Sequence, residues 1–234
     1  MSDSRSFQRF AAIMAIVSFF IAFASDILQG IPVNFNSEYP INPAIFLGVG
    51  EDGASLLRWG LILDMLGYYL PLLPIVLFAH HWLKTKSTTW LHFYTICGLG
   101  YILIGATGAI ILAVVQPPLI NAYAQASADQ RVLLGSIFGV IWNIVYEGVW
   151  NILGELLIAI WFLGVGSLLR SERRVLGLFG MLIGLSALLD SIGTMLGIDG
   201  LALLGVSVYI LLAPIWALWF GIDLLRKPVQ VQAA

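Results

Sequence analysis

Charged residues, histidine and cysteine are all scarce in this chain. Only 10% of its 234 residues are charged, whereas about a quarter are charged in soluble globular domains. It has three histidines and one cysteine, Cys97, which excludes an intrachain disulfide. The net charge of −2 is uninformative about partners, and we expect no nucleic-acid partner.

Apolar residues make up 60% of the chain, and the mean hydropathy is +0.95. Apolar runs long enough to cross a bilayer, which takes about 20 helical residues, fall at 10–29, 56–79, 90–115, 137–169, 175–197 and 201–225. Continuous runs such as LLPIVLF do not alternate as barrel strands do. The sequence therefore predicts an all-α polytopic membrane bundle with six transmembrane helices, and residues 1–234 form one such unit with no separate soluble domain.

Basic residues indicate the orientation. Nine of the eleven fall on one side if the spans are threaded in order, and only Arg58 and Arg131 lie on or near the other side. Because basic residues gather on the cytoplasmic side, we expect both termini in the cytoplasm and the chain in a bacterial inner membrane, with the lipid bilayer as its partner.

The first apolar run has a second interpretation. Arg5 and Arg9 precede it, and Ala22 and Ala24 imitate the small-residue cleavage site of a secretory signal peptide. The run continues past Ala24 to Leu28, so we expect an uncleaved first helix.

Proline and glycine suggest local features of the bundle. We expect Pro71, Pro74 and Pro214 to kink their helices and Pro117 with Pro118 to begin a turn after the third helix. Glycines in the third and fifth helices should let neighbouring backbones approach closely: Gly98, Gly105, Gly108, Gly180 and Gly184.

Four polar residues recur every four positions in the fourth span, which is otherwise apolar: Asn143, Glu147, Asn151 and Glu155. This spacing places them along one stripe of an α-helix. Carboxylates in a membrane segment are costly and usually face a bundle interior or a water-filled cavity. The stripe therefore indicates a functional site.

Further polar residues occur near the outer ends of other spans. With the stripe they form the candidate ligand-binding or polar network, which adds Asp26, Arg58, Asp64, Tyr68, Asp190 and Thr194. Arg58 is the only embedded cation, so we expect it to pair with Glu155 or Asp190. The inner half has almost no ionisable group, which argues against a path across the whole membrane.

Two functional classes fit this acidic, outward-facing site. We favour a ligand-binding or transport-associated protein that takes a small molecule or lipid from the outer side. The alternative is a structural or assembly subunit whose buried polar network only fixes helix packing. Oligomeric state and cofactors are not indicated.

An intramembrane enzyme is the less favoured class. The three histidines, His80, His81 and His92, flank an inner loop on the side opposite the acids, which excludes a mixed histidine and carboxylate zinc site. No G-x-S-x-G motif is present. We therefore assign no catalytic or metal-binding residue, although a carboxylate site for a hard cation such as Ca²⁺ stays open.

Two segments resemble a bacterial family of multi-pass membrane proteins catalogued only as a domain of unknown function. They are LLRWGLILDMLGYYLPLLPIVLFAHHWLK, with Arg58, Gly60 and Asp64, and RRVLGLFGMLIGLSALLDSIG, with Gly177 and Asp190. The resemblance covers most of the chain and implies a six-helix bacterial inner-membrane protein. The polar stripe of the fourth span is more acidic than in that family, and the resemblance leaves the activity open.

Overall fold

The computed structural model describes residues 2–36, 42–227 and 229. Within these residues it contains helices and no strand. Six helical segments are long and apolar enough to cross a membrane: Ser4–Val33, Gly50–Leu83, Thr89–Gln125, Ala128–Leu169, Arg174–Leu196 and Asp199–Arg226. They confirm the predicted all-α six-helix bundle and identify a multi-pass membrane protein.

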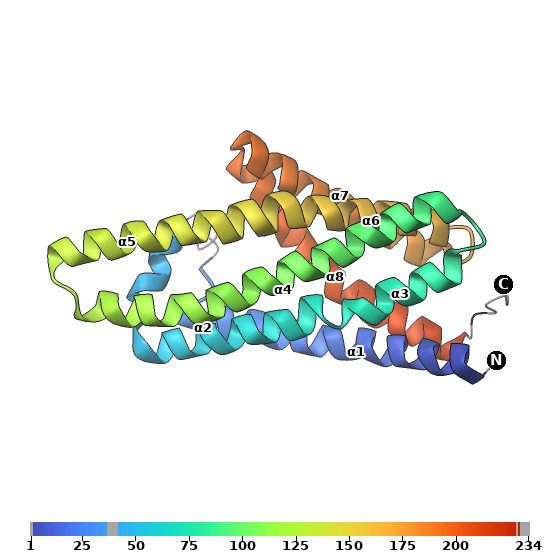
Figure 1. The fold of residues 1–234 in the computed structure, drawn as a ribbon, viewed down its shortest axis with the longest axis horizontal. Helices are drawn as coiled ribbons and strands as arrows, with labels where there is room; N and C mark the ends of the chain where they lie inside the picture. Colours follow the sequence, from blue (N-terminus) through green and yellow to red (C-terminus); the bar gives the residue numbers. More distant parts are fainter. Residues whose placement is uncertain (1, 37–41, 228, 230–234) are drawn as a thin grey trace.

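The elements follow one another along the chain as in Figure 1. The long helices are α1 (Ser2–Gly30), α2 (Gly50–Asp64), α3 (Leu72–Leu83), α4 (Thr88–Gln125), α5 (Ala128–Trp142), α6 (Glu155–Leu169), α7 (Arg174–Leu196) and α8 (Asp199–Arg226). Two 3₁₀ turns, η1 (Ile31–Val33) and η2 (Pro43–Gly48), lie between α1 and α2.

Helices α4 and α5 extend further than expected. The predicted turn at Pro117 and Pro118 is wrong, because α4 continues through both prolines to Gln125. Packing favours this continuation, since Ile120, just beyond the prolines, is fully buried. The chain turns instead at Ser127, whose side chain forms a reciprocal capping box with Gln130. This box fixes the beginning of α5.

Two spans contain wide π-helical stretches. In the second span, η3 (Met65–Tyr69) separates α2 from α3, and the backbone N–H of Leu70 donates to the carbonyl of Met65 five residues earlier. Pro71 follows and has no N–H to donate, so the predicted interruption occurs here. In the fourth span, η4 (Asn143–Gly154) joins α5 to α6. π-Helical turns are rare and often occur at functional sites.

The glycines of α4 make room for aromatic side chains rather than for neighbouring backbones. A Cβ atom would collide with the Trp161 ring at Gly98, the Tyr69 ring at Gly105 and the Trp150 indole at Gly108. The backbone contact expected at Gly184 is present, against Leu163 and Ala159, whereas the one expected at Gly180 is not, because Gly180 faces the side chains of Trp216 and Phe162. Glycines therefore allow helix contact on α7 and ring insertion on α4.

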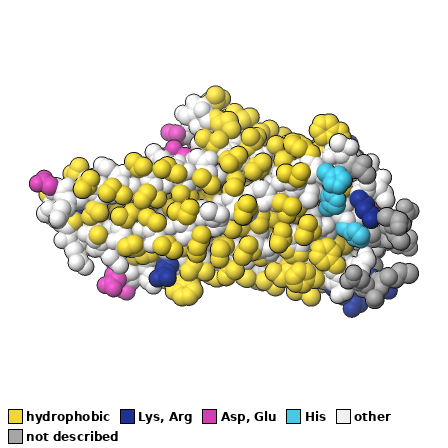
Figure 2. Space-filling model, viewed as in Figure 1, with side chains coloured by type: hydrophobic (Ala, Val, Ile, Leu, Met, Phe, Trp, Pro, Cys, Tyr) yellow, Lys and Arg dark blue, Asp and Glu magenta, His cyan; other side chains and the backbone are white. Residues whose placement is uncertain are grey.

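Charge is divided between the two ends of the bundle. Both termini lie at the end that also carries the α3–α4 and α6–α7 turns (Figure 1). On the face shown in Figure 2, histidines and most of the Lys and Arg side chains gather at this end, acidic side chains lie toward the other, and apolar side chains cover the middle. We call the end with the termini the basic end and the opposite one the acidic end.

Ion pairs at the basic end join the α6–α7 turn to α3 and α8. Glu172 accepts from Lys86 Nζ at 3.0 Å and from Trp82 Nε1 at 2.9 Å. Partial burial raises the pKa of Glu172, but these donors outweigh it and hold the pKa below its usual range. Arg173 Nε lies 2.8 Å from Asp223 Oδ2. These contacts tie the α3–α4 turn, the α6–α7 turn and α8 together at this end.

The α7–α8 contact yields a test of close packing. A Cβ atom on Gly205 would collide with the backbone of Asp190 and Ser186, so Gly205→Ala should lower the free energy of unfolding by about 1–3 kcal/mol. Gly139, in α5, has open space around it, and Gly139→Ala should be neutral or slightly stabilising. Melting curves in detergent compare the two. Equal melting temperatures for both variants would contradict the close approach.

Candidate functional site

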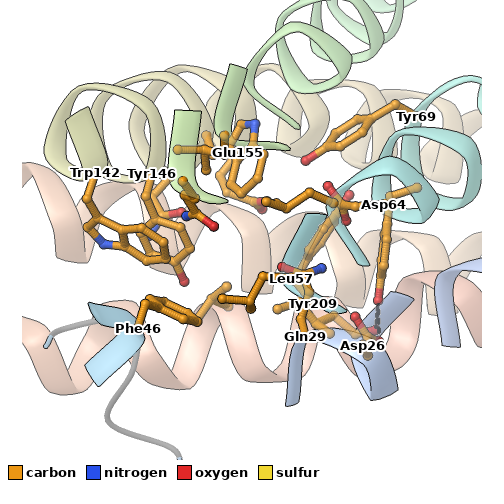
Figure 3. Close-up of a pocket in the computed structure, with 18 of the residues that line it drawn as sticks. Asp26, Gln29, Phe46, Leu57, Asp64, Tyr69, Trp142, Tyr146, Glu155 and Tyr209 are labelled. Atoms are coloured by element: carbon orange, nitrogen blue, oxygen red, sulfur yellow. Dashed lines mark hydrogen bonds between the residues drawn. The ribbon is translucent and has the colours of Figure 1, made fainter. Parts of the chain in front are cut away.

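A cavity of about 90 Å³ lies inside the acidic half of the bundle. Its walls come from every span except α7 and also from η2 (Figure 3). The volume is enough for several water molecules, since about 10–15 Å³ on this measure holds one. We call it the central cavity, and it is lined by Asp26, Gln29, Phe46, Leu57, Leu61, Asp64, Tyr68, Tyr69, Tyr101, Leu112, Gln116, Trp142, Tyr146, Trp150, Asn151, Glu155, Val206, Tyr209 and Ile210.

The π-helical stretches lie beside this cavity. Asp64 is the last residue of α2, and Tyr68 and Tyr69 belong to η3, directly after it. Asn151 lies in η4, and Glu155 begins α6. The changes from α to π geometry therefore coincide with the polar residues that reach the cavity.

Tyrosine hydroxyl groups and one indole form hydrogen bonds with part of the polar lining. Tyr68 Oη donates to Asp26 Oδ2 at 2.9 Å (Figure 3) and lies 3.2 Å from the carbonyl oxygen of Ile210. Tyr209 Oη donates to Tyr101 Oη at 2.7 Å. The Trp150 indole donates to the carbonyl of Gly105 at 3.1 Å. These bonds connect α1, η3, α4, η4 and α8 around the cavity.

Three oxygen atoms of the lining lack such partners. Asp64 Oδ2, Glu155 Oε2 and Gln116 Oε1 are buried, and none has a hydrogen-bond partner within the described residues. Asp64 is 9% exposed and Glu155 is 7% exposed. An unsatisfied buried polar group costs about 1–3 kcal/mol, and more when it is charged. The described lining also contains no Lys, Arg or His, so its carboxylates have no neighbouring cation in the cavity.

Aromatic rings form one wall of the cavity. The Phe46 ring of η2 lies 5.1 Å from the Trp142 ring, and Trp142 stacks on Tyr146 at 4.5 Å between centroids. Tyr146 in turn meets Trp150 edge to face at 6.0 Å. The turn η2 thus packs onto the fourth span and supplies part of the cavity wall (Figure 3).

Two further cavities adjoin the first. One, of about 130 Å³, shares Tyr146, Asn151 and Val206 with the central cavity, and Glu147 and Asp199 also line it. We call it the acidic vestibule. The other, of about 310 Å³, shares Asp26, Gln29 and Ile210 and is bordered by the exposed rings of Phe23 and Phe35. The central cavity therefore shares lining residues with a neighbouring cavity on each of two sides.

The structure brings most of the sequence-predicted polar residues to these cavities. The central cavity contains Asp26, Asp64, Tyr68, Asn151 and Glu155, and the acidic vestibule contains Glu147, Asn151 and Thr194. Asn143 is exposed, so the stripe is buried only over its second half. Asp190 is fully buried but lines neither cavity; Thr194 donates to its Oδ1 at 3.3 Å.

The expected ion pair of Arg58 is wrong for the described part of the chain. Arg58 is exposed, and the ion pairs among the described residues join Lys86 to Glu172 and Asp223 to Arg173 and Lys227. The reason is helical geometry. Asp64 faces the cavity from α2, and six residues correspond to about 120° around a helix, so Arg58 points away from it.

Several lining residues were not predicted from the sequence. Gln116 lies inside α4, next to the two prolines where a turn was expected, and Gln116 and Trp142 are 3% and 4% exposed. Nothing in the sequence around Tyr69, Tyr101 and Tyr209 indicates that they line a cavity. A polar residue inside an apolar helix, as Gln116 proves to be, was the one usable indication.

Metal ligands do not converge in the described residues: no group of three or more His, Cys, Asp or Glu side chains is arranged to hold an ion. The His80 ring lies 4.9 Å from His92, and its Nδ1 lies 2.8 Å from Thr95 Oγ1. This pair belongs to the turn between α3 and α4 at the basic end, away from the central cavity.

No known protein-family model, curated protein or solved structure matches the chain. The resemblance to a bacterial family of unknown function therefore stays a prediction. The properties of the site are argued from its own geometry.

Stability measurements test whether the cavity carboxylates are structural. Glu155→Gln should leave the melting temperature unchanged or raise it, because Glu155 Oε2 has no partner to lose. Tyr68→Phe should destabilise by about 1–3 kcal/mol, because it removes the donor to Asp26. Melting curves of both variants in the same detergent measure the two changes in stability. A loss in Glu155→Gln as large as in Tyr68→Phe would mean that Glu155 serves packing.

Proposed function

We propose that this membrane protein binds a small ligand in the central cavity from the outer side of the membrane, in a transport-associated role. One observation carries the proposal: Asp64, Glu155 and Gln116, from three different spans, each present an unpartnered buried oxygen at the same cavity. Buried polar groups in proteins are nearly always satisfied. A ligand that supplies donors would remove this cost.

The distribution of charge supports access from the outer side. Nine of the eleven basic residues lie in α1, in or directly after α8, in the turns of the basic end, or at the first residue of α7. By the positive-inside rule the basic end is cytoplasmic. The cavity lies toward the acidic end, which then faces outward across a bacterial inner membrane.

Packing below the cavity supports access from one side only. Large side chains fill the interior toward the basic end, and Phe78, Trp161, Trp216 and Phe220 are each at most 1% exposed. Ring contacts link Trp216 to Trp161 and to Phe220 at 5.9 and 4.9 Å. In this conformation the cavity is separated from the basic end by a packed aromatic core, as in an outward-open binding site.

The competing role as a packing scaffold requires a network in which every acid is paired. Asp26 is paired in this sense, because it accepts a hydrogen bond from Tyr68. Asp64 and Glu155 do not, since the described residues leave an oxygen of each without a donor beside open volume. A polar network that only fixed register would be better served by complete pairing. This contrast favours ligand binding.

Thiol labelling tests the location and openness of the cavity. Val206 lines both the central cavity and the acidic vestibule. In a Cys97→Ala background, Val206→Cys should react with small membrane-impermeant methanethiosulfonates, either the trimethylammonium or the sulfonate reagent, added outside sealed right-side-out vesicles. Mass spectrometry of the intact protein measures the modified fraction.

The matched control is Val165→Cys, since Val165 is 1% exposed and lines neither cavity. It should stay unmodified under the same conditions. Modification of Val206→Cys only from the cytoplasmic side would reverse the orientation, and no modification by either reagent from either side would contradict an open binding site.

A further inference from the structure

We infer that the central cavity takes a small organic ammonium ion, a positively charged nitrogen carrying methyl or other short apolar groups. This inference rests on the proposed function and names the chemical class of its ligand. Two properties of the lining decide the class: its carboxyl groups, which have no cation beside them, and its aromatic wall.

The charge of the lining selects a cation. Asp26, Asp64 and Glu155 come from three spans, and no Lys, Arg or His faces them from the described lining. Attraction between unit charges grows as the surroundings become less polar than water. An anionic ligand would meet repulsion from every ionisable carboxylate here.

The aromatic wall selects an organic cation over a metal ion. Phe46, Trp142, Tyr146 and Trp150 form a connected series of rings beside the carboxylates. The faces of such rings attract ammonium groups, and quaternary ammonium ions are commonly recognised in aromatic cages. A hard metal ion instead requires about six or more oxygen ligands, and no group of three candidate ligand residues converges in the described chain.

The size and approach of the cavity agree with this class. A volume of about 90 Å³ is small beside the roughly 300–1,000 Å³ of pockets for drug-sized ligands, so the ligand has few heavy atoms. Glu147 and Asp199 line the adjoining vestibule, which contains no basic residue among its described lining. Acidic groups in this neighbouring cavity raise the local concentration of cations beside the central one.

Three probes with the same branched body separate charge from shape. They are choline, its neutral isostere 3,3-dimethylbutan-1-ol, and the anion 3,3-dimethylbutanoate. Calorimetric titration of the purified full chain in nanodiscs should show choline binding about tenfold or more tighter than the neutral alcohol, with no binding of the anion. Choline is used as a probe of the class.

Two conservative variants test whether the cavity carboxyl groups are responsible for choline binding. Glu155→Gln and Asp64→Asn should each weaken choline binding about tenfold while leaving the affinity for the neutral alcohol unchanged. Asp129→Asn is the control, because Asp129 is exposed in the first turn of α5 and lines none of the cavities described. Size-exclusion profiles and melting curves establish that each variant is folded.

The outcomes separate the inference from the proposed function. Equal affinity for choline and the neutral alcohol, or choline binding insensitive to both cavity variants, would overturn the ammonium class and leave a ligand cavity in place. Labelling of Val206→Cys without binding of choline would also overturn the class alone. If Val206→Cys is not modified from either side, the proposed function fails together with the inference.

Discussion

Polar atoms inside a membrane bundle have no bulk water to bond to, so they need partners within the protein or in a bound molecule. Serine hydroxyls donate to neighbouring carbonyls, as Ser18 does to Gly67 and Ser25 to Gly60. Tyr68 donates to Asp26. Six buried side-chain nitrogen or oxygen atoms of the described residues have no hydrogen-bond partner, and three of them, the oxygens of Asp64, Glu155 and Gln116, occur together at one cavity; the others belong to Asn121, Trp161 and Asp190. The shared position of the three cavity oxygens makes a common functional cause more economical than three independent packing defects.

Local departures from regular helix geometry build the space around these atoms. Pro71 interrupts the second span after η3, and the fourth span widens through η4. Gly105 admits the Tyr69 ring, and Gly108 admits the Trp150 indole. Such irregular backbone is tolerated at membrane depth where it is buried in protein or lines a cavity. The same residues that weaken helix regularity therefore shape the walls of the site.

The sequence predicts the six spans because hydropathy averages over some 20 residues and tolerates errors in individual positions. It also predicts that Glu155, Asp64 and Asp26 lie inside, since embedded carboxylates rarely face lipid. It fails where the answer depends on a distant element. Phe46 reaches the cavity only because η2 packs onto Trp142, and Arg58 turns outward because the inward face of α2 is set by its neighbours.

An experimental density map of the protein in nanodiscs, at a resolution that shows ordered solvent, tests the central claim most directly. The account predicts non-protein density, either water or a ligand, within hydrogen-bond distance of the Asp64 and Glu155 carboxyl groups in the cavity on the acidic side. Protein side chains filling that space, with both carboxyl groups paired to protein donors, would contradict it.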